Sequence, residues 1–338
     1  MTPGDTPDPT PGPASPSGGR GRAPDVRELV DRARDGEARA VARLISLVED
    51  AGPAVREVAA ALAPHTGHAQ VVGLTGAPGV GKSTTTTALV RVLRGRGLRV
   101  GVLAVDPSSP FSGGALLGDR VRMEDHAGDD GVYIRSMAAR GHLGGLARAT
   151  PQALRVLDAA GCDVVLVETV GVGQSELEVA SLADTTVVLL APGMGDGIQA
   201  AKAGILEVAD VLVVNKADRD GADRTVRDLR SALGLGGRHE TPGAWCPPVV
   251  RTVATTGTGV DDLVRALGEH RAWLASSGEG PRRRSARAAR EIEAVALGAL
   301  RERMGDVRGS AALATLADQV AAGRTDPFRA AALLLDRL

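Results

Sequence analysis

Residues 76–83 read Gly76-Ala77-Pro78-Gly79-Val80-Gly81-Lys82-Ser83 and match the pattern G-x-x-x-x-G-K-[ST], which is typical of a phosphate-binding loop. An apolar run at 71–74 precedes the loop, and a helical pattern over 83–94 follows it. In such a loop the backbone N–H groups surround a β-phosphate, Lys82 reaches the β- and γ-phosphates, and the Ser83 hydroxyl occupies one Mg²⁺ position. The residues expected to bind the phosphates are Gly76, Gly79, Val80, Gly81, Lys82, Ser83 and Thr84.

Short apolar runs alternate with longer helical patterns from Gln70 onward. The runs cover 71–74, 100–105, 164–167, 186–190, 211–214 and 249–254. Because aromatic residues make up only 1% of the chain, Val, Leu, Ile and Ala must fill the core, which suits buried parallel strands covered by helices. We therefore expect an α/β fold, the doubly wound, mainly parallel sheet of P-loop NTPases, with its chemistry at the carboxyl ends of the strands.

The sequence Asn215-Lys216-Ala217-Asp218 follows the run at 211–214 and resembles the guanine-reading tetrad of GTPases. The Asp218 carboxylate can accept hydrogen bonds from the ring N–H and the exocyclic amine of guanine, whereas adenine would leave it unpaired. Sites built in this way reject the wrong ligand by up to about 10⁴- to 10⁵-fold. Because the tetrad contains the only asparagine of the chain, a chance match is improbable, and GTP is expected rather than ATP.

Glu168-Thr169-Val170-Gly171 closes the run at 164–167 and occupies the D-x-x-G position of GTPases, with glutamate in place of aspartate. A carboxylate there can hold Mg²⁺ through a bound water, and the Gly171 amide can donate to the γ-phosphate. Asp106 ends the run at 100–105 and is a second candidate for the Mg²⁺ side, the alternative being a turn-forming Asp before Pro107. The expected metal ligands are Ser83, Asp106 and Glu168.

Two further segments bear on hydrolysis. Val172 stands where many regulatory GTPases place a water-orienting glutamine, so intrinsic hydrolysis is expected to be slow. Gln174, two positions later, either supports that position or simply begins a helix. The glycine-hinged stretch 113–123 carries charges, including Asp119, that can swing to the nucleotide; an ordinary solvated loop is the alternative.

Lysine is rare in this chain, since only three of its 40 Lys and Arg residues, Lys82, Lys202 and Lys216, are lysines. Lys82 and Lys216 lie in the two nucleotide motifs. Lys202 lies in neither, and our hypothesis is that it approaches the nucleotide or pairs with Asp106 or Glu168 when a partner is bound; an ordinary helix-surface cation is the alternative. The candidate catalytic residues are Lys82, Glu168, Asp119 and Lys202.

Composition excludes several classes of protein. The formal net charge of −1 at pH 7 gives no basic field for nucleic acid or an anionic membrane. Cys162 and Cys246 are far apart, and no Cys/His cluster has ligand spacing, which argues against a disulfide framework and a metal-insertion site. Since no apolar run approaches the roughly 20 residues of a membrane helix and no secretion signal opens the chain, we expect a soluble, cytoplasmic protein.

Four segments are expected along the chain. Residues 1–24 are rich in Pro and Gly and read as a disordered tail, followed by a helical segment at 25–66, the P-loop GTPase domain at 67–277 and a helical segment at 278–338. In the last segment a break at 278–281 precedes an arginine run at 282–290, which we interpret as a solvated helix face. Asp326 is expected to cap a helix that begins at Pro327. The apolar faces of these helices need either the GTPase domain or another copy of the chain, the second of which predicts an oligomerisation arm.

Together with the phosphate loop and the tetrad, the stretches LAVDPSS (103–109), LGDRVRM (117–123) and ETVGVGQSE (168–176) carry a family resemblance. In this order the motifs resemble those of the methylmalonyl-CoA mutase-associated GTPases (MeaB-like), metallochaperone-type P-loop GTPases also described as ArgK or LAO/AO transport kinases. The resemblance runs from about residue 36 to about residue 274. It implies a homodimeric GTPase that uses Mg²⁺ and GTP/GDP, attends an adenosylcobalamin-dependent acyl-CoA mutase, gates cofactor loading and protects the mutase from inactivation.

The resemblance also assigns a nucleotide-responsive switch to the loop at 192–197 and the helix that carries Lys202. Two departures from the family pattern stand out: Pro110-Phe111-Ser112 replaces a Thr-Arg-type pair found in some members, and Val253-Ala254 replaces the usual Ser-Ala guanine loop. The Ala254 amide can still reach the guanine oxygen, so Val253 and Ala254 are expected nucleotide contacts. The alternative function is a kinase acting on an amino-acid transport component, which would need an acceptor pocket and, in that proposal, ATP.

Overall fold

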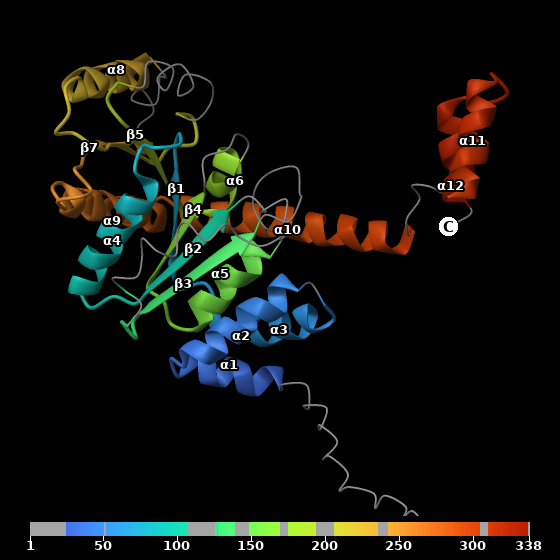
Figure 1. The fold of residues 1–338 in the computed structure, drawn as a ribbon, viewed down its shortest axis with the longest axis horizontal. Coiled ribbons are helices and arrows are strands. Elements are labelled where there is room, and N and C mark those ends of the chain that lie inside the picture. The colour runs from blue at the N-terminus through green and yellow to red at the C-terminus, as the bar shows by residue number, and fades with distance from the viewer. Residues whose placement is uncertain are drawn as a thin grey trace, which may run out of the picture.

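The computed structural model describes residues 25–50, 52–106, 126, 128–138, 149–169, 175–193, 206–235, 243–304 and 310–336 of the 338-residue chain. Its centre is a seven-stranded parallel sheet in the order β3-β2-β4-β1-β5-β6-β7 (Figure 1). The strands are β1 (Gln70–Thr75), β2 (Val100–Asp106), β3 (Val132–Ala138), β4 (Val164–Thr169), β5 (Thr185–Leu190), β6 (Val211–Val214) and β7 (Val249–Arg251). The expected doubly wound α/β fold is confirmed.

Two strands differ from the expectation. β3 has no counterpart among the predicted runs, because Arg135 and Ser136 interrupt its apolar residues; among the described strands it is an edge strand that pairs only with β2. Its Arg135 forms an ion pair with Glu49 and donates to Ser46 Oγ at 3.1 Å, which explains a charged residue in a strand. The predicted run at 249–254 is shorter in the structure, since β7 ends at Arg251.

Helices cover both faces of the sheet. α4 (Lys82–Gly95) and α9 (Val260–Ser276) pack on one face, against alternate strand residues such as Leu74 and Leu166. α5 (Thr150–Ala159), α6 (Ser175–Leu182) and α8 (Ala222–Leu235) lie on the other, against the intervening residues such as Val167 and Leu212. This alternation follows from the two-residue period of strand side chains, and burial on both faces explains the continuous apolar runs.

The helices before β1 are α1 (Val26–Arg34), α2 (Ala38–Glu49), α3 (Ala54–Leu62) and a short 3₁₀ turn, η1 (Ala63–His65). Their buried side chains, including Leu44, Ile45 and Leu62, belong to the same apolar core as α5. Asp25 caps α1 by accepting a hydrogen bond from the backbone N–H of Arg27 at 2.9 Å. The expected helical segment therefore packs on the outside of α5 and β3.

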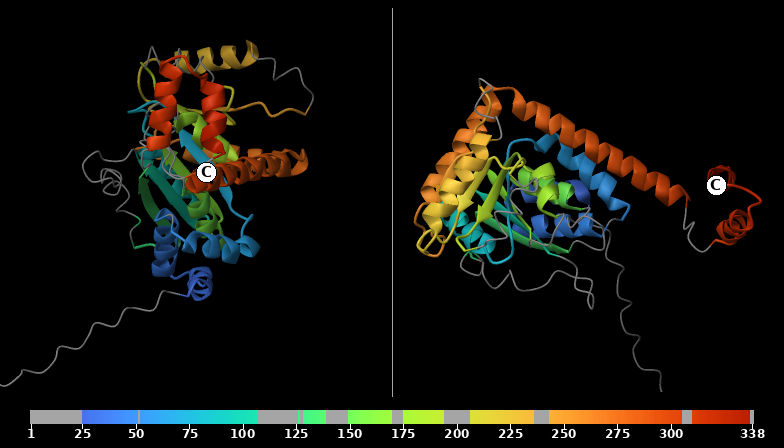
Figure 2. Two further views of the ribbon diagram at one scale, coloured as in Figure 1. Left: turned by 90° about the vertical axis from the view of Figure 1, so that its right-hand side faces the viewer. Right: turned by 90° about the horizontal axis from the view of Figure 1, so that it is seen from above.

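After α9 the chain forms α10 (Glu279–Met304), α11 (Ala311–Ala321) and α12 (Pro327–Leu335). α10 runs out of the body of the molecule, and α11 and α12 lie beyond its far end (Figures 1 and 2). The predicted cap is confirmed, because the Asp326 carboxylate accepts from the backbone N–H groups of Phe328 and Arg329, each at 3.0 Å. The break before α10 is shorter than expected: α9 ends at Ser276 and α10 begins at Glu279, so Pro281 stands in its first turn.

Charged side chains hold α10 to the sheet. Arg283 Nη1 lies 3.1 Å from both carboxylate oxygens of Asp210, and Arg287 Nη2 lies 2.6 Å from Asp184 Oδ1. Both aspartates are buried at the amino ends of their strands, β6 and β5, where a carboxylate requires donors. The interpretation of the arginine run as a solvated face is therefore wrong for Arg283 and Arg287.

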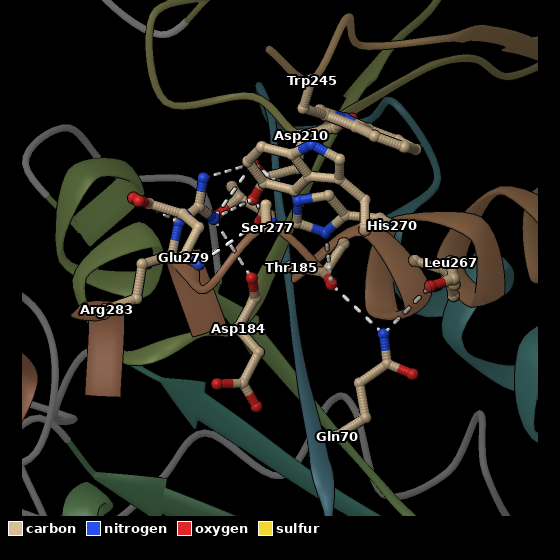
Figure 3. Close-up of polar contacts among 12 residues, drawn as sticks. Gln70, Asp184, Thr185, Asp210, Trp245, Leu267, His270, Ser277, Glu279 and Arg283 are labelled. Atoms are coloured by element: carbon tan, nitrogen blue, oxygen red, sulfur yellow. Dashed lines mark hydrogen bonds and ion pairs between the residues drawn. The ribbon is translucent and has the colours of Figure 1, made fainter. Parts of the chain in front are cut away.

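A chain of polar contacts continues from Asp210 into the core (Figure 3). Gln70 Nε2 donates to Thr185 Oγ1 at 3.2 Å, and that hydroxyl lies 2.9 Å from His270 Nδ1. On the other side of the imidazole ring, His270 Nε2 lies 3.3 Å from Asp210 Oδ1. The contacts join β1, β5, α9 and the base of α10 at the end of the sheet opposite the phosphate loop.

Within the described ranges, none of the helices has the length and hydrophobicity needed to span a membrane.

Candidate functional site

The phosphate loop connects β1 to α4 at the carboxyl end of the central strand. Gly81 has φ 96°, a left-handed conformation that favours glycine, and a Cβ there would lie 2.4 Å from Asn215 Nδ2. The Lys82 side chain is buried and folds back over the loop, where Nζ donates to Gly76 O at 2.7 Å and Ala77 O at 3.2 Å. The loop therefore encloses a cation beside the first backbone N–H groups of α4, an arrangement suited to an anion.

Ser83 and Glu168 lie together on the β4 side of the loop. Glu168 Oε1 is 2.5 Å from Ser83 Oγ, and Oε2 is 3.0 Å from Thr86 Oγ1. The Glu168 side chain is buried, with 3% of its residue surface exposed, and both hydroxyl groups are hydrogen-bond partners of its carboxylate. Hydroxyl and carboxylate oxygens are the ligands that Mg²⁺ prefers, and the donor set present here fits that ion.

Asn215 joins three segments on the β6 side of the loop. Its Nδ2 donates to Val80 O at 2.8 Å, and its Oδ1 accepts from Ala254 N and Thr252 Oγ1, each at 3.1 Å. The side chain is buried. Since the phosphate loop, the tetrad and the segment after β7 share this one amide, their relative positions are fixed by it.

The remaining residues of the tetrad face the loop or the solvent. Lys216 has a positive φ of 56°, and its Nζ donates to Gly79 O at 2.7 Å, so its aliphatic stem spans from β6 to the phosphate loop. Asp218 is exposed and its carboxylate is accessible to a ligand. Val253 and Ala254 follow β7, where Val253 pairs with Thr258 in an isolated bridge. The structure thus brings the residues predicted to bind the phosphates and the guanine base together at the carboxyl ends of the strands.

Several predicted site residues lie outside the described residues. These are Asp119, Gly171 and Lys202, as well as Val172 and Gln174. The backbone of Asp106 ends β2 as expected, but its side chain is not described. The roles assigned to these residues stay predictions.

The sequence interpretation missed two residues of the site, Thr86 and Thr252. Thr252 precedes Val253-Ala254 and holds Asn215 Oδ1. Thr86 stands three residues after Ser83, the helical spacing that places two side chains on one face, and this spacing was the signal that could have found it.

The chain has the fold of the P-loop NTPases: a parallel sheet of this order, with a phosphate loop between its central strand and the following helix. The chain belongs to the methylmalonyl Co-A mutase-associated GTPase MeaB family, whose sequence model matches residues 41–307.

Individual relatives agree with this assignment. A putative GTPase of Pyrococcus horikoshii is 46% identical over 316 residues, which cover 93% of this chain and 98% of that protein. The mouse protein named methylmalonic aciduria type A homolog, mitochondrial, is 43% identical over 211 residues, 62% of this chain and 50% of the mouse protein. The crystal structure of an LAO/AO transport system kinase superposes with a TM-score of 0.66 at 26% identity, covering 92% of this chain and 96% of that chain.

Proposed function

We propose that this protein is a GTP-hydrolysing chaperone of an adenosylcobalamin-dependent acyl-CoA mutase of the methylmalonyl-CoA mutase type. In this role it gates cofactor loading and protects the mutase from inactivation. The family match over residues 41–307 carries the proposal, because the family is described by its association with methylmalonyl-CoA mutase. The similarity to a mouse protein named for methylmalonic aciduria supports it from a second direction.

The nucleotide in this proposal is GTP, with its phosphates on the loop around Lys82 and its base between Asp218 and the Ala254 amide. Asp218 is exposed and offers two acceptor oxygens to the ring N–H and exocyclic amine of guanine. The stem of Lys216, which reaches Gly79, provides an apolar surface for one face of the base. The contacts of Asn215 with Val80 and Ala254 support this arrangement, because they hold the phosphate loop next to the proposed base site.

Ser83 would hold Mg²⁺ directly and Glu168 would hold it through water, with Asp106 as the further candidate. When bound, the ion supplies a positive charge that neutralises charge on the β- and γ-phosphates. Lys82 stabilises the same charge from the other side of the loop, and the Gly171 amide donates to the γ-phosphate. Asp119 and Lys202 complete the catalytic set in the proposal, and slow basal hydrolysis follows from Val172 in place of a water-orienting glutamine.

A kinase for an amino-acid transport component is the second candidate, favoured by the likeness to the LAO/AO transport system kinase structure. The same loop can bind ATP or GTP, so the distinction lies in the base site. The asparagine hub and the accessible Asp218 support guanine, and the GTPase reading is therefore preferred.

The partners in the proposal are the mutase and a second copy of this chain. α10 exposes Ile292 and Val295, with 70% and 58% of their surface accessible, and α12 exposes Phe328 with 87%. Large apolar side chains that are this exposed, on helices that extend away from the sheet domain, support an interface with another copy of the chain. We place the homodimer in the cytoplasm, with neither nucleic acid nor a membrane as partner.

The proposal is tested by expressing the protein together with a cobalamin-dependent mutase from the same genome and measuring cofactor loading with GTP, GDP or no nucleotide. We expect co-purification, loading that depends on the nucleotide, and faster GTP hydrolysis in the presence of the mutase. The Lys82→Ala variant serves as the control that should lose the nucleotide dependence. A protein that neither binds nor responds to any such mutase would overturn the chaperone function.

A further inference from the structure

Four consecutive threonines, Thr84 to Thr87, follow Ser83 in the first turns of α4. The Thr85 hydroxyl donates to Gly81 O at 2.9 Å, and the Thr87 hydroxyl donates to Ser83 O at 3.0 Å, each to the carbonyl one turn earlier. Thr86 has the corresponding contact to Lys82 O at 3.1 Å, but its hydroxyl also lies 3.0 Å from Glu168 Oε2. Thr86 is thus distinguished from Thr85 and Thr87 by a contact outside its own helix.

Thr86 and Ser83 each contact one oxygen of the Glu168 carboxylate. One carboxylate oxygen is 2.5 Å from Ser83 Oγ and the other is 3.0 Å from Thr86 Oγ1. Ser83 and Thr86 are three residues apart and share one face of α4, so the two hydroxyl groups present themselves side by side to β4. A glutamate has one more rotatable bond than the aspartate usual at this position, and two fixed oxygens remove that freedom.

The hydroxyl proton of Thr86 has two possible acceptors, Lys82 O and Glu168 Oε2. It can serve only one of them well, and a carboxylate is the stronger acceptor of the two. Thr86 and Glu168 are both buried, with 0% and 3% of their surfaces exposed, so water does not readily replace the bond if it is lost. We therefore expect the Thr86 hydroxyl to donate its hydrogen bond to the Glu168 carboxylate.

We propose that Thr86 is a positioning residue for the metal site: it holds the Glu168 carboxylate so that its other oxygen stays at Ser83. Residues that orient metal-binding groups from behind typically change metal affinity by about 10- to 100-fold when they are removed. The inference rests on the proposed function, because it requires Ser83 and Glu168 to serve Mg²⁺.

The test compares Thr86→Val with Thr85→Val and Thr86→Ser in the full-length protein. Both valine variants remove a buried hydroxyl that lies within hydrogen-bond distance of a carbonyl in the preceding turn, but only Thr86→Val removes the contact with Glu168. The probe is a GTP analogue that carries a fluorescent label on its ribose, titrated at a series of Mg²⁺ concentrations, with no turnover required. The thermal midpoint of each variant is recorded in parallel.

For Thr86→Val we expect the Mg²⁺ concentration at half-maximal tightening to rise about 10-fold or more, while affinity without Mg²⁺ stays within about twofold of the wild type. Thr85→Val and Thr86→Ser should follow the wild-type curve. An unchanged Mg²⁺ dependence in Thr86→Val, or an equal shift in Thr85→Val, would overturn the inference and leave the proposed function intact. Failure of the wild-type protein to bind the GTP analogue would overturn the proposed function itself, and the inference with it.

Discussion

The side-chain amide of Asn215 donates to the carbonyl oxygen of Val80 at 2.8 Å and so binds the carboxyl end of β6 to the phosphate loop. The other end of the same amide accepts from the backbone N–H of Ala254. A loop rich in glycine would otherwise gain much conformational entropy when empty, and this buried contact restrains it. The phosphate loop and the segment after β7, which are the proposed phosphate and base sites, are therefore linked through one residue.

Replacement of Asn215 by alanine should weaken GTP binding and lower the stability of the protein. The substitution leaves Val80 O and Ala254 N without their partner in a buried place, at a cost of about 1–3 kcal/mol for each unsatisfied group. Denaturant unfolding and calorimetric GTP titration measure the two effects. Thr252→Val is the graded control, because it removes only one of the donors to Asn215. Wild-type affinity and stability in Asn215→Ala would show that the hub is dispensable.

Alanine at Gly81 should abolish nucleotide binding, whereas alanine at Gly79 should weaken it less. Both residues have a positive φ, 96° and 79°, so both substitutions carry the left-handed strain of about 1–2 kcal/mol. Only the Gly81 substitution also places a Cβ 2.4 Å from Asn215 Nδ2, while nothing lies within 4 Å of a Cβ at Gly79. The difference between the GTP affinities of the two variants, measured by titration, gives the effect of the clash between a Cβ at position 81 and Asn215. Equal losses would mean that backbone strain alone governs both positions.

The fold could be predicted from the sequence because it rests on local patterns, and the candidate site rests on local motifs that the structure brings together. The buried strands β1, β4 and β6 read as apolar runs, and the loop and tetrad carry their own spacing. β3 could not be found in this way, since an edge strand with one open side holds residues such as Arg135 whose partner, Glu49, is distant in the chain. The contact between Thr86 and Glu168 is likewise created only when β4 and α4 pack together.

The arginine run of α10 shows the same limit of sequence reasoning and yields a further prediction. Arg283→Met should destabilise the protein by about 1–3 kcal/mol, because the buried Asp210 carboxylate loses a donor, whereas Arg282→Met should be nearly neutral. The side chain of Arg282 is 82% exposed, and among the described residues its ion pair is with the neighbouring Glu279, at 3.5 Å. Thermal unfolding measures the difference.

Tryptophan fluorescence offers an independent readout of the same region. The rings of Trp245 and Trp273 lie with their centroids 4.8 Å and 5.6 Å from the His270 ring, beside Asp210. Arg283→Met should therefore alter the emission spectrum of the folded protein, and Arg282→Met should not. Matching spectra and matching unfolding midpoints for the two variants would contradict the anchoring role of Arg283.

Asp129 should titrate in the folded protein at a pH well below its ordinary range. Arg94 donates to both of its carboxylate oxygens, at 2.8 Å and 2.6 Å, and this contact lowers the pKa of Asp129 from 3.8 to about 2. Because the pKa is lower in the folded state, the contribution to stability is complete above pH 3.8 and is lost as the pH falls toward 2. Carboxyl NMR titration checks the value. In Arg94→Gln the pKa should return toward 3.8, and a wild-type pKa already near that value would refute the effect.

The central claim is that Asn215, Asp218 and the loop around Lys82 form one guanine-nucleotide site, and calorimetry of the wild-type protein with GTP and with ATP tests it most directly. With Mg²⁺ present, we expect GTP to bind one site per chain and ATP to bind weaker by at least about 10²-fold, within the range that hydrogen-bonded base sites achieve. Equal affinity for the two nucleotides would contradict the guanine assignment and would favour the alternative function as a kinase.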